Sequence, residues 1–200
     1  AKNLADVLEQ IVEGTVVSYS VTLIEGWKFI QIMGLLESSE HLIPDLSGLT
    51  EAEILSKIES KYAHAEGIFF PDTYHTVRGE RQSAVLSRAH KMMNLKLNEI
   101  WLSRSPDLPL QNPYEALILA SIIEKETAKD GERPHIAGVL VNRLKKNMVL
   151  QVDPTVIYGL GEYFTGDLQY HHLKLDGPYN TYTRKGLTPT PIANPGLKSL

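Results

Sequence analysis

Two carboxylates stand close together at the end of an apolar segment. The stretch ALILASIIEKETAKD, residues 116–130, is apolar as far as Ile123 and then contains Glu124 and Glu126. A carboxyl group at the end of a buried helix that lines a cleft is partly removed from water, which raises its pKa and suits proton donation near neutral pH. The same triplet is also typical of a helix whose last turn emerges into solvent. On its own it favours that structural interpretation.

The helix that carries these carboxylates has a well-marked beginning. Asn112 can cap it, Pro113 suits its first position, and Glu115 follows three residues after the cap. At about 100° per residue, Glu126 falls beneath Ile122 and Ile123, whereas Glu124 lies roughly 200° away from it. The two carboxylates therefore point in opposite directions. They cannot flank one scissile bond as the acid and base of a two-carboxylate glycosidase, so at most one does the chemistry.

Polar and aromatic residues are concentrated downstream of this helix. In QVDPTVIYGLG we expect Asp153 to cap a single short turn that presents Tyr158, with Pro154 first and Gly159 as the stop. The later stretch YNTYTRKGLTPTPIANPG adds amide and hydroxyl groups beside aromatic faces, which suit sugar rings. These residues are consistent with a carbohydrate groove, although Tyr-rich loops are often only packing.

The composition is that of a folded domain. Of the 200 residues, 42% are apolar and 22% charged, which is close to globular averages. The net charge of −4 and the scattered Lys and Arg residues argue against nucleic acid as a partner. The absence of cysteine excludes disulfides and thiolate chemistry and leaves the compartment open. The longest apolar run is far shorter than the roughly 20 residues of a membrane span, and a start without Met or signal segment suggests a piece of a longer protein.

The remaining pattern predicts an α+β fold, mainly helical, with long ordered loops. We expect helices at residues 4–12, after Gly26, after Thr50 with a Thr50–Glu53 capping box, at 83–103, after Asn112 and at 133–146; a strand at 18–24; and ordered irregular segments at 66–80 and beyond 147.

Other chemistries find weaker support. No H-E-x-x-H motif is present, and His171 and His172 are expected in a loop with diverging side chains, so a metal site is not indicated. Ser121 lacks the glycines of a nucleophile elbow, which argues against a serine hydrolase.

A family resemblance then becomes specific. The motifs ASIIEKET, NRL, LQVDPTVIYGLG, YNTY and PIANPG occur in an order and spacing that resemble the endolytic murein transglycosylases, the MltG/YceG-like family. EGIFFPDTY resembles the entry to that family's catalytic domain, and TLIEGW resembles the strand and turn that leave its LysM-like domain. The resemblance covers nearly the whole chain. GLTPTPIANPG departs from a commoner Gly-Leu-Pro-Pro-Gly pattern, and family members continue beyond GLKSL.

The resemblance implies that residues 1–27 are the end of a LysM-like α/β unit and residues 28–200 the catalytic domain. It implies that Glu126 is the single catalytic acid, with Glu124 and Thr127 as supporting neighbours. The groove residues it implies are Gln151, Asp153, Tyr158, Asn180, Tyr182 and Asn194, and Asp153 could equally be no more than a helix cap.

The implied reaction cleaves the MurNAc–GlcNAc β-1,4 bond inside nascent glycan strands and leaves 1,6-anhydroMurNAc ends, without metal or cofactor. The implied partners are peptidoglycan glycan strands and peptidoglycan synthases. The implied location is the extracytoplasmic side of the inner membrane, held by an N-terminal anchor outside this chain. The alternative is a non-catalytic module that binds peptidoglycan or serves as a synthase scaffold.

Overall fold

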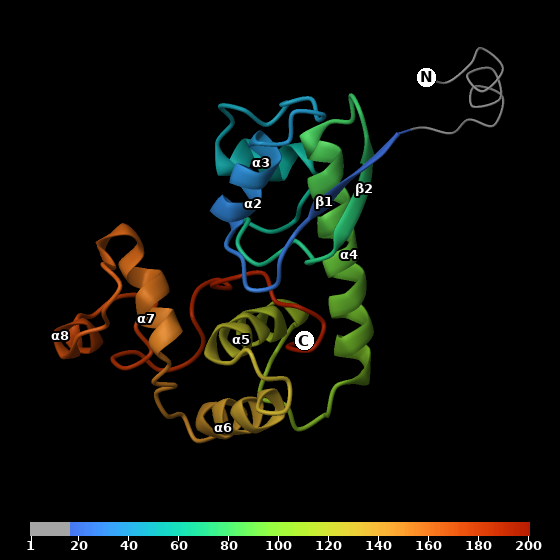
Figure 1. Cartoon of the computed structure of the whole chain (residues 1–200). Helices are drawn as coiled ribbons and strands as arrows, with labels where there is room; N and C mark the ends of the chain where they lie inside the picture. Colours follow the sequence, from blue (N-terminus) through green and yellow to red (C-terminus); the bar gives the residue numbers. More distant parts are fainter. Residues whose placement is uncertain (1–16) are drawn as a thin grey trace, which may run out of the picture.

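The fold combines seven helices and one two-stranded sheet in residues 17–200, the part of the chain that this computed structural model describes (Figure 1). The elements in chain order are β1 (Ser18–Thr22), α2 (Phe29–Glu37), α3 (Glu51–Lys57), β2 (Thr73–Val77), α4 (Gln82–Ser103), α5 (Pro113–Glu126), α6 (Arg133–Lys145), α7 (Asp153–Leu160), the 3-10 helix η1 (Gly161–Tyr163) and α8 (Tyr170–Lys174). The predicted mixed α+β class is confirmed. The helix expected at residues 4–12 lies outside the described residues.

Capping residues begin the helices where the sequence predicts. Thr50 accepts a hydrogen bond from the Glu53 backbone, and the Glu53 carboxylate accepts one from the Thr50 backbone in return. The Asn112 side chain accepts a hydrogen bond of 3.0 Å from the Glu115 backbone N–H at the start of α5. No helix within residues 17–200 is both long enough and apolar enough to cross a membrane.

The segment at residues 66–80 was predicted to be irregular, and this is wrong for its second half. Residues Thr73–Val77 form β2, which pairs antiparallel with β1 in the register Thr22 to Thr73 and Ser18 to Val77. The side chains of β2 alternate between exposed and buried, with Tyr74 and Thr76 facing inward. The nearby Pro71 and Gly79 mark the two ends of the strand and do not interrupt it.

The expectations for the region after residue 150 also need correction. Val152 is the cap of α7, and Asp153 is its first residue, so the Asp153 side chain is free for another contact. The helix continues through Gly159 to Leu160 and ends at Gly161, which has a φ of +55°. His171 and His172 belong to helix α8 and do not diverge, because their ring centroids lie 4.0 Å apart.

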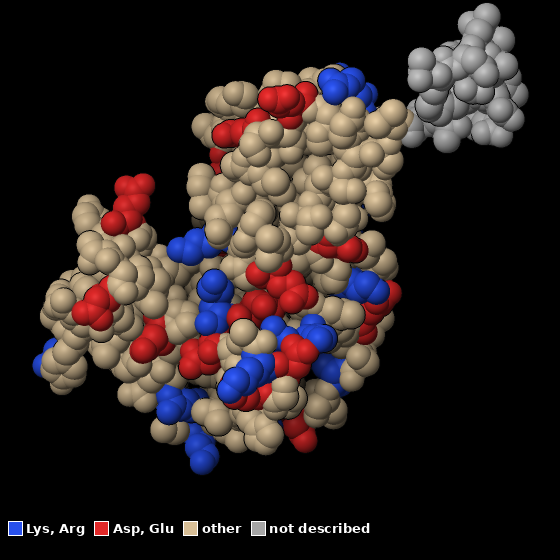
Figure 2. Space-filling view, in the orientation of Figure 1, with Lys and Arg blue, Asp and Glu red and all other residues tan. Residues whose placement is uncertain are grey.

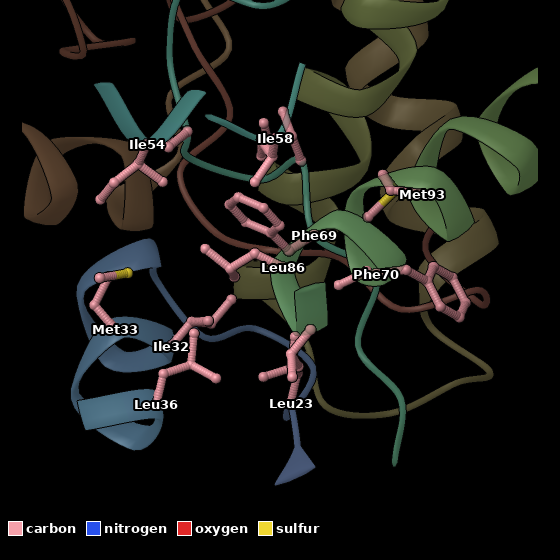
Figure 3. Close-up of a cluster of buried hydrophobic side chains, with 14 of the residues drawn as sticks. Leu23, Ile32, Met33, Leu36, Ile54, Ile58, Phe69, Phe70, Leu86 and Met93 are labelled. Atoms are coloured by element: carbon pink, nitrogen blue, oxygen red, sulfur yellow. The ribbon is translucent and has the colours of Figure 1, made fainter. Parts of the chain in front are cut away.

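Helix α5 lies between two hydrophobic cores. One core gathers buried side chains of β1, α2, α3, β2 and α4 together with Leu117 of α5, and Figure 3 shows Ile32, Phe69 and Leu86 within it. The other joins α5 to α6 and to residues 150–152 and 192, through side chains such as Ile122. In Figure 1, α5 accordingly lies at the centre of the molecule. A helix that packs against two cores is buried on most of its surface, so most of its residues are expected to be apolar, as in α5.

The predicted first unit contributes to the same packing. Val21 and Leu23 are buried in the core that holds α2, α3 and α4. The boundary after residue 27 and the likeness of residues 1–27 to a LysM domain both stay predictions.

A segment near the end of the chain, which includes Asn194, connects parts of the protein that are far apart in the sequence. The side chain of Asn194, which is 1% exposed, accepts a hydrogen bond from the Phe69 backbone N–H at 2.9 Å and donates one to the Trp27 carbonyl at 2.9 Å. Gly67 faces this segment with a φ of +80°, and a Cβ there would lie 2.3 Å from the Pro191 side chain. Only glycine fits this close approach.

We expect Asn194→Ala to lower the free energy of unfolding by about 2–4 kcal/mol, because it leaves a buried N–H and a buried carbonyl without partners. Urea unfolding followed by circular dichroism measures the change. Asn142→Ala, on the exposed side of α6, is the control and should shift the value by less than about 0.5 kcal/mol. Equal effects of the two variants would contradict the clamping role of Asn194.

Candidate functional site

Glu126 lies in a pocket of about 260 Å³ between the end of α5, α6 and the segment before α7. The pocket is lined by Glu126, His135, Ile136, Val139, Leu140, Arg143, Leu150, Gln151 and Val152. Its walls are mostly apolar, with a few polar groups at the rim. We call it the Glu126 pocket.

The surroundings of Glu126 favour its protonated form. The residue is open to solvent on one side, whereas the pocket walls remove water from the other. This partial burial raises the pKa of the Glu126 carboxyl, and the negative charge of Asp153 raises it further. The carboxyl is therefore both accessible to a large substrate and suited to donating a proton.

Asp153 is held by a tyrosine hydroxyl from the loop after α8. The Tyr182 hydroxyl donates a hydrogen bond to Oδ1 of Asp153. Burial, together with this bond and the charges of Asp153 and Glu126, raises the pKa of Tyr182 to about 12, so the hydroxyl keeps its proton. The predicted acid Glu126 and two residues predicted for the groove, Asp153 and Tyr182, thus act on one another electrostatically.

Gln151 forms part of the wall beside Glu126. Its backbone has a φ of +55°, a left-handed conformation that is costly for a residue with a side chain. The Gln151 backbone N–H donates to the Thr181 carbonyl at 2.9 Å, and the Arg143 guanidinium donates to the Gln151 side chain at 3.2 Å. The amide is therefore held at the rim of the pocket.

Glu124 points away from the pocket into a polar network inside the protein. Its carboxylate pairs with Arg133 at 3.3 Å, and each of the two side chains is 7% exposed. It also accepts hydrogen bonds from the Gly196 backbone N–H at 3.0 Å and the Ser199 hydroxyl at 2.7 Å. The predicted divergence of Glu124 and Glu126 is therefore present in the structure.

Thr127 ends α5 and lies against the following loop. Its hydroxyl donates to the Glu132 carboxylate at 2.7 Å and accepts from the Lys129 backbone N–H at 3.0 Å. These contacts fix the turn that follows Glu126. They are structural contacts, and a role of Thr127 in support of Glu126 stays a prediction.

Both asparagines expected in the groove are buried and have other partners. Asn180 donates to the carbonyls of His172, Leu173 and Leu175 and accepts from the Tyr182 backbone. Asn194 binds Phe69 and Trp27, as described above. Both side chains are at most 5% exposed. In the structure both side chains hold loops together, and neither lines the Glu126 pocket, whereas Asn180 lies at a separate cavity with His172 and Tyr179. Their contact with a substrate stays a prediction.

Tyr158 does not line the Glu126 pocket. Its hydroxyl donates to the Glu66 carboxylate at 3.2 Å, and its ring packs against Tyr179 with 4.9 Å between the centroids. Burial raises the pKa of Glu66 to about 7. Tyr158 instead lies in a neighbouring cavity with Lys28 and Lys125.

The sequence analysis did not assign several of these residues to the site. His135 and Arg143 line the Glu126 pocket from α6, and Glu66 holds Tyr158 from a segment far away in the chain. The placement of Arg143 could have been inferred from the helical spacing of His135, Val139 and Arg143, every fourth residue on one face of α6. Glu66 gives no comparable local signal.

Metal binding receives no support in the described part of the chain, since no group of three His, Cys, Asp or Glu residues in it could hold a metal ion. Ser121 is fully buried, and its hydroxyl accepts a hydrogen bond from the Ile192 backbone at 3.0 Å. It is a packing residue of α5.

The fold and site together define a helical α+β domain with a single accessible carboxyl group in an apolar pocket. Residues 1–200 match the YceG-like family, and the chain belongs to that family. The chain is 31% identical to the endolytic murein transglycosylase of Bacillus subtilis strain 168, over 98% of this chain and 59% of that protein.

Two further relatives support the assignment. The endolytic murein transglycosylase of Streptococcus pneumoniae strain D39 is 31% identical over 68% of this chain and 25% of its own length. The crystal structure of a YceG-like protein from Listeria monocytogenes superposes with a TM-score of 0.71 at 29% identity, over 100% of this chain and 71% of that chain. The chain thus spans about three-fifths of the Bacillus relative and a quarter of the pneumococcal one.

Removal of the two carboxylates should affect stability to very different extents. We expect Glu124→Ala to lower the free energy of unfolding by about 3 kcal/mol, because it leaves the buried Arg133 guanidinium with only Asp130 as a partner. Glu126→Ala should change it by less than about 1 kcal/mol, since this residue is exposed. Thermal and urea unfolding of both variants provide the comparison. A larger loss for Glu126→Ala would contradict the assignment of Glu124 as the structural member.

Proposed function

We propose that this domain is a lytic transglycosylase that cleaves glycan strands of peptidoglycan, with Glu126 as its only acid and base. One observation carries the proposal: Glu126 is the carboxyl group at the end of α5 that opens into a pocket and has a raised pKa, while Glu124 is committed to Arg133. The names of the relatives from Bacillus and Streptococcus agree with this activity.

The reaction needs one carboxyl group in two protonation states. The Glu126 carboxyl gives its proton to the oxygen that links MurNAc to GlcNAc, and the bond from this oxygen to C1 of MurNAc breaks. The resulting carboxylate then accepts the proton of the MurNAc 6-hydroxyl while that oxygen forms a bond to C1. The product is a 1,6-anhydroMurNAc end, no water is consumed, and Glu126 is again protonated.

Asp153 and Tyr182 tune this group. The charge of Asp153 keeps Glu126 protonated to higher pH, and the hydrogen bond from Tyr182 keeps Asp153 in place beside it. The Asp153 carboxylate also bears a negative charge near the centre that becomes positive when the glycosidic bond breaks, which would stabilise the transition state.

The polar rim provides contacts for the sugar. The Gln151 amide, oriented by Arg143, borders the acid, and the apolar wall around Leu140 and Val152 suits the carbon face of a ring. Because the substrate is a cell-wall polymer, we expect the domain to work on the extracytoplasmic side of the membrane. Peptidoglycan synthases remain proposed partners.

The decisive experiment incubates the protein with uncrosslinked glycan strands and analyses the chain ends by mass spectrometry. We expect anhydro ends with the wild-type protein and a loss of at least about a hundredfold in Glu126→Gln, because general acid catalysis contributes on this order. Glu124→Gln should retain activity at temperatures where it is folded.

The same experiment separates the competing functions. New reducing ends would mean that water attacks, with Asp153 as the second carboxylate of a hydrolase. Intact strands that stay bound to the protein would favour a non-catalytic binding or scaffold module. If the Glu126→Gln variant were as active as the wild-type protein, the proposed mechanism would be contradicted.

The pH dependence offers an independent test through Asp153→Asn. The acid must be protonated, so cleavage should fall as the pH rises through the pKa of Glu126. Removing the charge of Asp153 removes one cause of the raised pKa, so we expect this alkaline fall to move to lower pH. Burial of Glu126 persists in the variant, so part of the upward shift should remain. A pH profile of kcat/KM that keeps its midpoint would contradict the coupling of the two carboxylates.

A further inference from the structure

A second, smaller cavity lies where the loop before α2 meets α5 and α7. It measures about 140 Å³ and is lined by Lys28, Lys125, Pro154, Ile157, Tyr158 and Ile192. No carboxylate is among these residues. We call it the lysine cavity.

Both lysines bring positive charge to this cavity that no carboxylate neutralises at contact distance. Within residues 17–200, neither Lys28 nor Lys125 has a carboxylate oxygen within the 4.0 Å of an ion pair. Lys28 lies over the Tyr158 ring, 5.1 Å from its centroid. Figure 2 shows a few Lys and Arg side chains between the α7–α8 region and the body around α5, with Asp and Glu side chains close by.

The groups that form the lysine cavity are already held in position. Lys125 donates a hydrogen bond of 3.2 Å to the Gly26 carbonyl, and Tyr158 is fixed between Glu66 and Tyr179. Glu66 lies behind the tyrosine hydroxyl, where it is largely buried, and the charge of Lys28 partly offsets the upward shift of its pKa. The cavity itself therefore presents cations and an aromatic ring, an arrangement that favours an anion with a short apolar stem.

The position of the lysine cavity links it to the proposed chemistry. Lys125 directly precedes Glu126 in α5, and Pro154 directly follows Asp153 in α7, so the lysine cavity is lined by the chain neighbours of the Glu126–Asp153 pair. An engineered protein cavity of about 150 Å³ holds one benzene molecule. The lysine cavity thus has room for a carboxylate and a few carbons but not for a sugar ring.

We propose that the lysine cavity binds a carboxylate carried by the glycan strand, in the same bound molecule whose glycosidic oxygen faces Glu126. The identity of this ligand as a part of peptidoglycan rests on the proposed function. Two groups of a strand have the required chemistry: a carboxylate of the peptide stem, and the lactyl carboxylate of MurNAc that is free where the stem has been removed.

The test measures binding without cleavage, in the Glu126→Gln background. The ligands are stem-bearing strand fragments and the same fragments after an amidase has removed the stems, and calorimetry gives their affinities. We expect Lys28→Gln to weaken binding of one fragment about fivefold, as for a partly exposed charged hydrogen bond. The fragment that is affected identifies the carboxylate. Lys28→Arg should restore most of the affinity because it keeps the charge.

Lys61→Gln is the matched control, since Lys61 also lies over a tyrosine, Tyr62, at 5.3 Å but outside both cavities. It should leave both affinities unchanged. The proposal would be overturned if Lys28→Gln bound both fragments as tightly as the Glu126→Gln parent does, or if the parent bound neither fragment. Cleavage by the protein with native Glu126 is scored separately. If the protein cleaves strands but Lys28→Gln leaves the affinities unchanged, only the role of the lysine cavity is refuted. If Lys28→Gln weakens binding but the protein cleaves no strands, only the proposed reaction is refuted.

Discussion

The arrangement of the site depends on a buried ion pair at the end of α5. Glu124 and Arg133 are both almost fully enclosed, and burying two charges is costly unless further hydrogen bonds complete the geometry. The Gly196 N–H and the Ser199 hydroxyl supply these bonds to Glu124. Since residues two positions apart on a helix diverge by roughly 200°, holding Glu124 inside directs Glu126 outward. The orientation of the proposed acid is thus a consequence of interactions on the opposite side of its helix.

Polar residues in this domain divide into those that hold the chain together and those that face the pocket. Asn180 and Asn194 saturate their amides with backbone groups, as buried amides must, Asn180 within its own part of the chain and Asn194 on distant segments. Gln151, from the segment before α7, lines the Glu126 pocket, and Tyr182, from the loop after α8, binds the Asp153 carboxylate. An amide suits both tasks equally well, so residue type alone could not separate them.

The features that were predictable from sequence are those that local rules determine. The cap at Asn112, the length of α5 and the divergence of Glu124 from Glu126 all follow from helix geometry within a few residues. The strand β2 was missed because its partner β1 lies about fifty residues earlier, and its two-residue alternation is visible only once that pairing is known. The partners of Asn194 likewise lie more than a hundred residues away.

The backbone of Gln151 indicates how the pocket is kept in shape. A left-handed residue with a side chain persists only where its surroundings enforce it, and here Thr181 provides the enforcement. Its carbonyl accepts from the Gln151 N–H, and its hydroxyl accepts from the Val152 N–H and contacts the Thr155 hydroxyl at 2.8 Å. Tyr182, next along the chain, holds Asp153. One short loop therefore constrains the pocket wall, the start of α7 and the carboxylate that raises the pKa of Glu126, which explains why a long stretch so poor in regular structure is nonetheless well packed.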